Sequence, residues 1–377
     1  MFNIYKTNRI EVISELLAKD LIINPPLITE KIDIAIPNYF FGKWLRDQIT
    51  LTNQISALYE LKTISNFTEV LLGKFLPEVK LGLWNFESIK WAFLDSLEEL
   101  NTYEESFPIS NWINKYLDNQ KIIDGDIYNL AKKIANNFVN YLTFRPEMIS
   151  DWNRYELYSP KLFNNLNSNE FWQPILYKLI EKRISGKPSC LYMMDIVNNF
   201  RKFKNYNNIM PRQIYIISDN NLSNLQLNFY LKVADLTKVN LYILSAGDNF
   251  WSRINTFEGE VNFRNEGSKS YISNISIEKI FGKFGGNYEK LIEENTNVEE
   301  IILNNNSIYI DPTINLFEKN DNTLLNQIQK KLIDNNKLDL IIKSKDDSII
   351  FKGHLNQLSQ LEYIRKKIIE LLEFNNE

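Results

Sequence analysis

The residue types that most often carry out covalent chemistry are scarce in this sequence. It contains one histidine, His354, and one cysteine, Cys190. A Ser-His-Asp or Cys-His enzyme would have to use His354 as its base, yet that residue lies near the C-terminus in a polar stretch. A lone cysteine forms no internal disulfide, and a Cys/His zinc site lacks ligands. These classes of protein are therefore set aside.

Phosphate-binding loops are the next candidates, because a first strand followed by a helix is where they usually lie. The connection here is Lys6-Thr7-Asn8-Arg9, which contains no glycine and so cannot wrap a phosphate with backbone amides. The string Gly186-Lys187-Pro188-Ser189 resembles the end of such a motif, but Glu181 replaces its first glycine. We interpret that string as a turn, and expect no cofactor in this chain.

Carboxylates offer weaker candidates for metal chemistry. Asp219 follows the predicted strand Ile214–Ile217, where a nucleotide-binding sheet would place a magnesium ligand. Its neighbour is Asn220, so an Asp-Glu pair is missing, and without a phosphate loop we interpret Asp219 as a turn or helix-capping residue. Asp124-Gly125-Asp126 is typical of a turn with Asp126 as a helix N-cap. The glycines Gly282, Gly285 and Gly286 follow no clear strand, so a dinucleotide site there is weakly supported.

Positive charge is concentrated between Lys178 and Arg212, although the whole chain has a formal net charge of −4. The overall charge has the wrong sign for a free-standing, non-specific nucleic-acid binder, but permits a local basic channel. Such a run either forms a solvated helix face or lines a phosphate path. The cations are Lys178, Lys182, Arg183, Lys187, Arg201, Lys202, Lys204 and Arg212, and the nearby rings are Phe171, Trp172, Tyr177 and Tyr192. Such rings stack on bases or, more commonly, pack in a core.

The elements that position these residues follow from hydrophobic periodicity. Strand patterns occur at Phe2–Tyr5, Ile32–Ile36, Ile214–Ile217 and Val239–Leu244, and each of the first three precedes a helical pattern. Successive strand-helix units predict a parallel sheet with right-handed crossovers. Residues 66–203 show helical patterns almost without strands.

Several helix ends and one further strand are also predicted. Asn66 and Glu69 form a plausible capping pair, and the helix that begins near Asp126 should end at Arg145-Pro146. Near the C-terminus, Ser348–Phe351 has a strand pattern, and a helix follows over Leu355–Leu372.

Length and composition agree with a multidomain globular protein. The chain has 377 residues, of which 44% are hydrophobic and 24% charged. Neither a signal peptide nor a membrane-spanning run is evident, so we expect a cytoplasmic protein without membrane contact.

The chain also resembles a known family, the RecC proteins, which are the gamma subunits of exodeoxyribonuclease V. The similarity is to their N-terminal part and runs collinearly through five strings: IYKTNRIEVISELL (4–17), FGKWLRDQI (41–49), NYLTFRPEMISDW (140–152), FWQPILYKLI (171–180) and SIIFKGHLNQLSQLEYI (348–364). No single string is diagnostic, and their order and spacing carry the resemblance.

The resemblance implies an α/β fold with a P-loop-helicase-like parallel sheet, inactivated by loss of the ATP-binding motifs, and a large all-helical insertion. It divides the chain into four parts: 1–65 begins the helicase-like domain, 66–205 is the helical insertion, 206–345 completes the domain, and 346–377 starts a second helicase-like domain. Family chains are much longer, so this one is expected to be a fragment, a truncated reading frame or an unusually short subunit. In a truncated chain, Leu361, Ile364 and Ile368 would be exposed.

The family role is DNA-break repair by homologous recombination, as a non-motor subunit. The implied partners are a RecB-like helicase-nuclease, a RecD-like helicase and single- and double-stranded DNA ends, with ATP and Mg²⁺ held by the partner subunits. The candidate DNA-binding residues are Arg145, Tyr141, Trp172, Lys178 and Arg183. Where the family's tunnel pattern has apolar or aromatic residues this chain has Thr63 and Glu69, and Asn136 and Val139 replace acidic ones.

Two alternatives of other classes stay open. One is a metal-dependent nucleotide- or sugar-phosphate enzyme that uses Asp219, and the other is a plain interaction domain without DNA contact.

Overall fold

The computed structural model describes residues 1–25, 31–54, 59–107, 109–118, 124–219, 222–245, 285, 288, 291–292, 294–295, 308–312, 323–334 and 346–374. Contacts divide the chain into two compact units, Met1–Tyr309 and Ile310–Glu377. The predicted boundaries at residues 65 and 205 lie within the first unit, and the four-part division remains a prediction. Gly282, Gly286 and Asn220, which the sequence singled out, lie outside the described residues.

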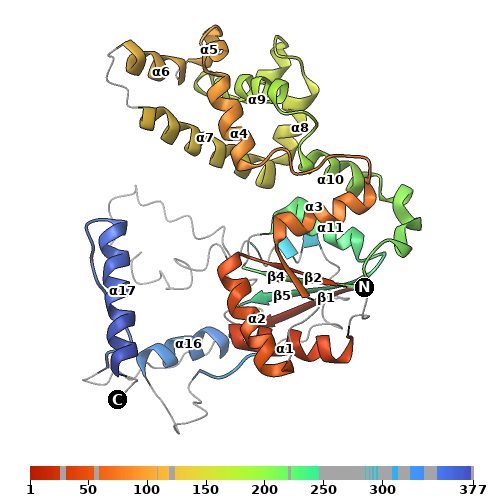
Figure 1. Ribbon diagram of the computed structural model, residues 1–377, viewed down its shortest axis with the longest axis vertical. Coiled ribbons are helices and arrows are strands. Elements are labelled where there is room, and N and C mark those ends of the chain that lie inside the picture. Colours follow the sequence, from red (N-terminus) through yellow and green to blue (C-terminus); the bar gives the residue numbers. More distant parts are fainter. Residues whose placement is uncertain are drawn as a thin grey trace, which may run out of the picture. The chain divides into compact units, whose positions relative to one another are not determined.

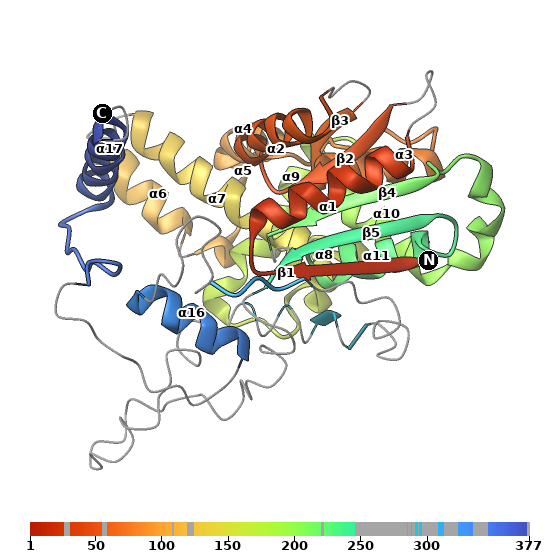
Figure 2. The same cartoon turned by 90° about the horizontal axis from the view of Figure 1, so that it is seen from below.

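A five-stranded parallel sheet forms the centre of the first unit. Its strands are β1 (Phe2–Thr7), β2 (Ile32–Ile36), β3 (Tyr59–Thr63), β4 (Gln213–Ser218) and β5 (Lys238–Leu244). They lie in the order β1-β5-β4-β2-β3, and all neighbours pair in parallel (Figure 2). The α/β class and the parallel sheet predicted from the sequence are confirmed, and β3 is an additional strand.

The strands bury both faces, as expected for a sheet covered by helices on each side. Side chains alternate along a strand, so Ile214 and Ile216 of β4 enter one hydrophobic core while Tyr215 and Ile217 enter another. The second core contains α1 (Ile10–Ile23) and α2 (Tyr39–Asn53), and the first contains α3 (Ile64–Phe75), α10 (Ser189–Asn198) and α11 (Asn224–Val233). Figure 1 shows these two groups of helices on opposite sides of the sheet.

The connection between β1 and α1 is a turn of only Asn8 and Arg9. The backbone N–H of Arg9 donates to Oγ1 of Thr7 at 3.3 Å, and the N–H of Ile308 donates to the carbonyl oxygen of Lys6 at 2.9 Å. A phosphate loop needs a longer, glycine-containing connection whose amides point at the ligand. The carboxyl end of β1 is instead closed by the protein's own backbone.

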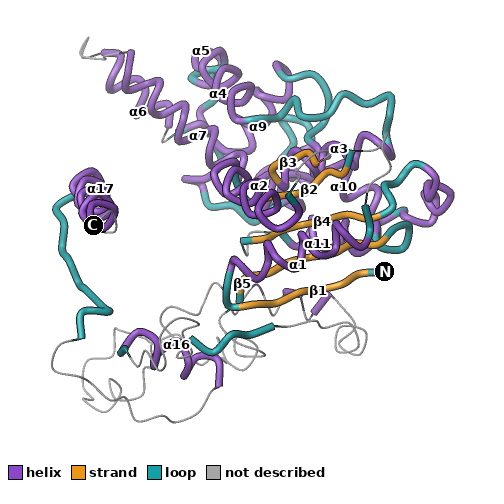
Figure 3. Tube along the Cα trace, turned by 60° about the horizontal axis from the view of Figure 1, so that its bottom comes forward, coloured by secondary structure: helices purple, strands orange, loops and turns teal. Residues whose placement is uncertain are grey.

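Between β3 and β4 the chain forms a helical layer with its own core. The layer runs over residues 86–183, and its helices are α4 (Phe86–Asp95), α5 (Leu97–Leu100), α6 (Ile109–Asp118), α7 (Asp124–Phe144), α8 (Pro146–Arg154) and α9 (Trp172–Arg183), with short 3₁₀ turns at Glu104–Ser106, Pro160–Phe163 and Ser168–Glu170. Phe138, Ile149 and Leu176 are fully buried in this core. Figure 3 shows the helices as purple coils distinct from the orange strands. After α10 a 3₁₀ segment, Phe200–Asn208, leads to β4.

Helix ends match the predictions in part. Pro146 starts α8 and ends the continuity with α7, as expected from a residue that has no backbone N–H to donate to a carbonyl oxygen of the preceding turn. The helix α7 begins at Asp124, so Asp126 lies within its first turn and is not the N-cap predicted from the sequence. Thr63 caps α3, since its Oγ1 accepts from the N–H of Asn66 at 3.4 Å. The predicted Asn66–Glu69 capping pair is therefore wrong, and Glu69 has another environment.

The second unit contains α16 (Leu324–Asp334) and α17 (Gln357–Phe374). The predicted strand Ser348–Phe351 does not form: these residues make a bend followed by irregular backbone, and Phe351 is exposed. A strand needs a neighbouring strand to pair its N–H and C=O groups, and none of the described residues supplies one here. Leu361, Ile364 and Ile368 are exposed on α17. Among the described helices, none is long and apolar enough to cross a membrane.

Candidate functional site

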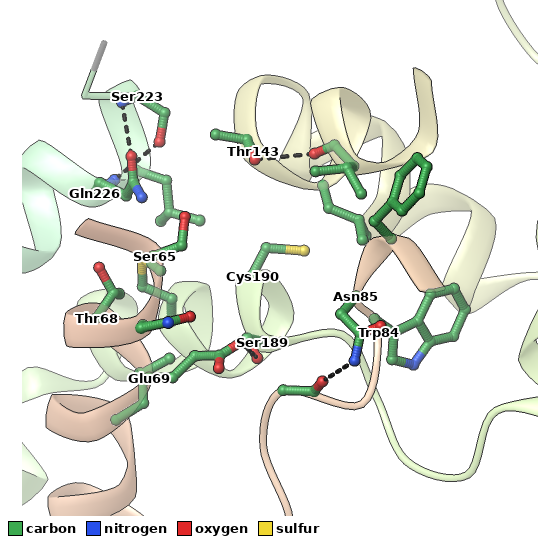
Figure 4. A pocket seen from close by; sticks show the side chains of 18 residues that line it. Ser65, Thr68, Glu69, Trp84, Asn85, Thr143, Ser189, Cys190, Ser223 and Gln226 are labelled. Atoms are coloured by element: carbon green, nitrogen blue, oxygen red, sulfur yellow. Dashed lines mark hydrogen bonds between the residues drawn. The ribbon is translucent and has the colours of Figure 1, made fainter. Parts of the chain in front are cut away.

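A cavity of about 350 Å³ lies between the helices that cover one face of the sheet and the helical layer. We call it the pocket. Its walls come from α3, α10 and α11 on one side and from α7 and the segment before α4 on the other (Figure 4). Because α3 and α11 directly follow β3 and β4, the pocket lies near the carboxyl ends of parallel strands, where ligands bind in open α/β sheets.

Glu69 of α3 is the charged side chain of the pocket. Its Oε1 accepts a long hydrogen bond of 3.4 Å from the Ser189 hydroxyl, and it has no cationic partner among the described residues. Burial raises the pKa of this carboxyl above its usual range, while the Ser189 hydroxyl opposes that shift. A Cβ atom on Gly82 would lie 2.8 Å from Oε2 of Glu69, and Gly82 has a φ of +73°. Only glycine fits this wall of the pocket without strain.

The remaining lining combines polar and apolar groups. Asn85 accepts from the N–H of Ser88 and Ser223 accepts from the N–H of Gln226, so these side chains are held in place by helix capping. The other lining residues are Ser65, Asn66, Thr68, Leu72, Trp84, Phe86, Val139, Leu142, Thr143, Cys190, Met193 and Leu225. None of the lining residues that the structure describes is lysine or arginine. The pocket therefore suits a neutral, hydrogen-bonding group with a flat apolar body better than a phosphate.

Cys190 reaches the pocket but is a poor nucleophile. Burial raises the pKa of its thiol to about 12, so almost none of it is thiolate at neutral pH. The indole N–H of Trp84 donates to the carbonyl oxygen of Gly186 at 2.9 Å, which ties the segment before α4 to the segment before α10. Both residues serve the shape of the pocket.

Arg145 stands at the corner between α7 and α8, two residues beyond the pocket residue Thr143. Its backbone N–H continues α7 by donating to the carbonyl oxygen of Tyr141 at 2.9 Å, and its side chain is exposed. In the part of the chain that the structure describes, the guanidinium has no carboxylate partner. Tyr141 lies within electrostatic reach of both Arg145 and Glu170, and burial raises the pKa of its hydroxyl. Among the described residues, Arg145 is thus an unpaired cation two positions along the chain from the pocket wall.

Three other predicted DNA-binding residues pack within the helical layer. Lys178 is nearly buried, and its Nζ donates to Oε2 of Glu181 at 2.8 Å and to the carbonyl oxygen of Asn153 at 3.2 Å. Trp172 is half-buried at the start of α9 and packs on the core of the helical layer. Tyr141 packs against the same core, with its ring centroid 6.2 Å from that of Trp152.

Arg183 belongs to what we call the charge clamp, which consists of Lys182 and Arg183 of α9 with Asp95 and Glu99. Nε of Arg183 donates to Oδ2 of Asp95 at 2.6 Å, and its Nη1 donates to Oε2 of Glu99 at 3.1 Å. Lys182 donates to Oε1 of Glu99 at 2.8 Å. These contacts join α9 to α4 and α5. DNA binding by Lys178 and Arg183 remains a prediction, and both cations already have partners within the protein.

The positions that differ from the family's tunnel pattern cluster in part. Glu69 and Val139 both line the pocket, whereas Thr63 caps α3 and Asn136 is exposed on α7. Sequence reasoning treated Glu69 as a helix cap and missed the pocket, although the departure from the family pattern at this position was a usable signal. Asp219 is exposed, and the described residues contain no group of three or more His, Cys, Asp or Glu side chains that could hold a metal ion.

Comparison with known proteins places these features in a family. Residues 2–335 match the family described as RecC, N-terminal domain. The RecBCD enzyme subunit RecC of Haemophilus influenzae is 26% identical over 160 residues, which cover 41% of this chain and 14% of that protein. The corresponding subunit of Escherichia coli is 22% identical over 156 residues, covering 40% of this chain and 13% of that protein. The matched region is therefore a small part of each relative's length.

The family match extends over most of the chain, from β1 through α16, and includes both the sheet and the helical layer. It also covers the pocket and Arg145. The chain belongs to the RecC family, and it matches the N-terminal domain of that family.

Proposed function

We propose that this chain is a non-motor subunit that guides single-stranded DNA during unwinding in double-strand-break repair by homologous recombination. The relatives are named as subunits of the RecBCD enzyme, so the proposed partners are a RecB-like helicase-nuclease and a RecD-like helicase. We propose that the sheet is helicase-like and does not bind ATP. The two-residue turn between β1 and α1, which is too short for a phosphate loop, supports this proposal. ATP and Mg²⁺ would be used by the partner subunits, in the cytoplasm.

The observation that carries this proposal is the pairing of a pocket without cations and a free arginine beside it. A nucleobase is flat, apolar on its faces and hydrogen-bonding at its edge, and the pocket offers an apolar wall with Glu69, Gln226 and hydroxyl groups. The carboxylate repels a phosphate but accepts hydrogen bonds from N–H groups at a base edge, such as the N3–H of thymine. The exposed Arg145 would bind the adjoining phosphate. Phosphate contacts of this kind position a nucleic acid, whereas contacts to base edges read its sequence.

The metal-dependent enzyme that uses Asp219 is the weaker reading. The family match favours a RecBCD-type subunit. Asp219 is exposed and belongs to no cluster of ligands among the described residues.

The first test measures binding of a labelled oligothymidine to the full chain by fluorescence anisotropy. Arg145→Ala should weaken binding by about tenfold and reduce the slope of log K against log salt by about 0.7, the value for one phosphate on a single strand. Arg154→Ala is the matched control, because Arg154 is an exposed arginine at the other end of α8 and should change affinity less than about twofold.

A second measurement addresses the partners. The chain should co-elute with the RecB-like helicase-nuclease of the same organism in size-exclusion chromatography without DNA. If neither variant changes the affinity, or if the chain binds no single-stranded DNA and elutes alone, the proposal fails.

A further inference from the structure

Two short segments of chain join the helical layer to the helices that cover the sheet. The first runs over residues 76–85, between α3 and α4, and the second over residues 184–188, between α9 and α10. We call them the two linkers. Each contains a glycine in the left-handed region, Gly82 with a φ of +73° and Gly186 with a φ of +85°. The pocket is lined by residues of the first linker and by Ser189, which directly follows the second.

Trp84 connects the two linkers to each other. Its indole N–H donates to the carbonyl oxygen of Gly186 at 2.9 Å, and its ring stacks on Tyr177 of α9 with the centroids 5.3 Å apart. The side chain of Leu83 also lies 3.5 Å from the position that a Cβ atom on Gly186 would occupy. Trp84 is buried, and an indole N–H left without an acceptor there would cost free energy. The indole therefore fixes the spacing of the two linkers.

Glu69 lies between the two linkers. On one side, its Oε2 lies 2.8 Å from where a Cβ atom of Gly82 would be, so the backbone of the first linker closes over the carboxylate. Asn85 holds that backbone, because its side-chain amide donates to the carbonyl oxygen of Gly82 at 3.0 Å (Figure 4). On the other side, Oε1 accepts from the hydroxyl of Ser189. A change in the spacing of the linkers would therefore open the surroundings of Glu69.

We propose that Trp84 is a positioning residue for the pocket: by holding the two linkers together, its indole N–H keeps the Glu69 carboxylate enclosed and aimed at the edge of a bound base. A preorganised acceptor binds more tightly because little ordering is needed on binding. Loss of the indole N–H would let the linkers separate and admit water to the carboxylate. This inference rests on the proposed function, because Glu69 is the base acceptor proposed there.

The first measurement needs no DNA. Carbon NMR of labelled glutamate carboxyl groups in the full chain gives the pKa of Glu69, which is assigned by the signal missing from Glu69→Gln. Burial raises this pKa in the wild type. Among the described lining residues the other titratable group is the Cys190 thiol, whose pKa burial raises to about 12, so it stays neutral in acid. Trp84→Phe should lower the pKa of Glu69 by about 0.5, towards its ordinary value, as water enters.

The second measurement is binding of the labelled oligothymidine at pH 7. Trp84→Phe should weaken binding by about threefold, because the acceptor for the N3–H of thymine is less well held. Replacement of Trp84 by benzothienylalanine, in which sulfur takes the place of the N–H, should have the same effects on the pKa and on binding. This analogue keeps the shape of the ring, and it therefore tests the inference even if Trp84→Phe does not fold.

Trp152→Phe is the matched control. Trp152 is also buried, and its ring centroid lies 5.8 Å from that of Tyr177, but it belongs to α8 and not to a linker. This variant should lose stability in urea as Trp84→Phe does, yet leave the pKa of Glu69 unchanged and the affinity within about twofold of wild type.

The outcomes separate this inference from the proposed function. If Trp84→Phe and the analogue leave the pKa of Glu69 unchanged, or if Trp152→Phe lowers it equally, Trp84 only packs and the inference fails while the proposed function stands. If the wild-type chain binds no single-stranded DNA, the proposed function fails, whatever the NMR titration shows.

Discussion

Glu99 and Glu69 are both helical glutamates in the first unit, yet their surroundings are opposite. In the charge clamp, Glu99 accepts from Lys182 and Arg183, and the Lys182 hydrogen bond, ahead of Arg183, lowers the pKa of its carboxyl. In the pocket, Glu69 accepts a long hydrogen bond from Ser189 and has no other partner among the described residues, and burial raises the pKa of its carboxyl. In the charge clamp the charged side chains join helices to one another, whereas the buried carboxylate of the pocket lowers the free energy of unfolding. Unpaired charge marks the site better than charge density does.

The largest effect should come from breaking the clamp. Arg183→Ala removes hydrogen bonds to Asp95 and Glu99 and to the backbone of α4, and should lower the free energy of unfolding by about 1–3 kcal/mol. Urea denaturation followed by circular dichroism measures this change. Affinity for single-stranded DNA should stay within about twofold of wild type. A variant of unchanged stability that binds DNA poorly would reverse the roles assigned to the clamp and the pocket.

A smaller effect of opposite sign is expected in the pocket. The folded-state pKa of Glu69 lies above its unfolded value. The ionised carboxylate therefore lowers stability, and this cost is absent at low pH and appears as the pH rises through the unfolded and then the folded pKa. Glu69→Gln should therefore increase the free energy of unfolding at neutral pH by less than about 1 kcal/mol, which raises the melting temperature slightly. This gain should disappear below pH about 4. Thermal melts across this range check the trend. A loss of stability at neutral pH would mean that Glu69 has a structural partner.

The smallest effect sharpens the comparison from the acid side. The folded-state pKa of Glu99 is lowered. The ionised carboxylate therefore contributes to stability above the unfolded pKa of about 4, and this contribution is lost as the pH falls through the folded-state pKa. A double-mutant cycle of Lys182→Ala and Glu99→Gln should give a coupling energy of about 0.5 kcal/mol at neutral pH, since both side chains are partly exposed. The coupling should approach zero in acid. A coupling that is independent of pH would exclude an ionic contact.

The sequence predicted the parallel sheet well because its central strands are nearly all apolar. Ile214–Ile217 and Val239–Ile243 are buried on both faces, and such apolar runs are typical of the central strands of a parallel sheet. β3 was missed since Tyr59–Thr63 is half-exposed along its whole length, with Glu60 and Lys62 paired to each other and to Asp33 and Lys31 at the edge of the sheet. An edge strand with this composition has no strong hydrophobic signal.

The candidate site was predicted less completely. Tyr141 and Arg145 could be selected from the resemblance, but the charge run that included Lys178 and Arg183 could not be divided into paired and free cations. That division depends on Asp95 and Glu99, which lie more than eighty residues away in the sequence and meet α9 only in the folded helical layer.

The short turn between β1 and α1 has a consequence for the evolution of this protein. Substitutions alone cannot create a phosphate-binding loop there, because such a loop would require an insertion of about six residues at that turn and displacement of the backbone around Ile308. An insertion at this turn, and not point mutation, is the change that would open this end of β1 to a phosphate.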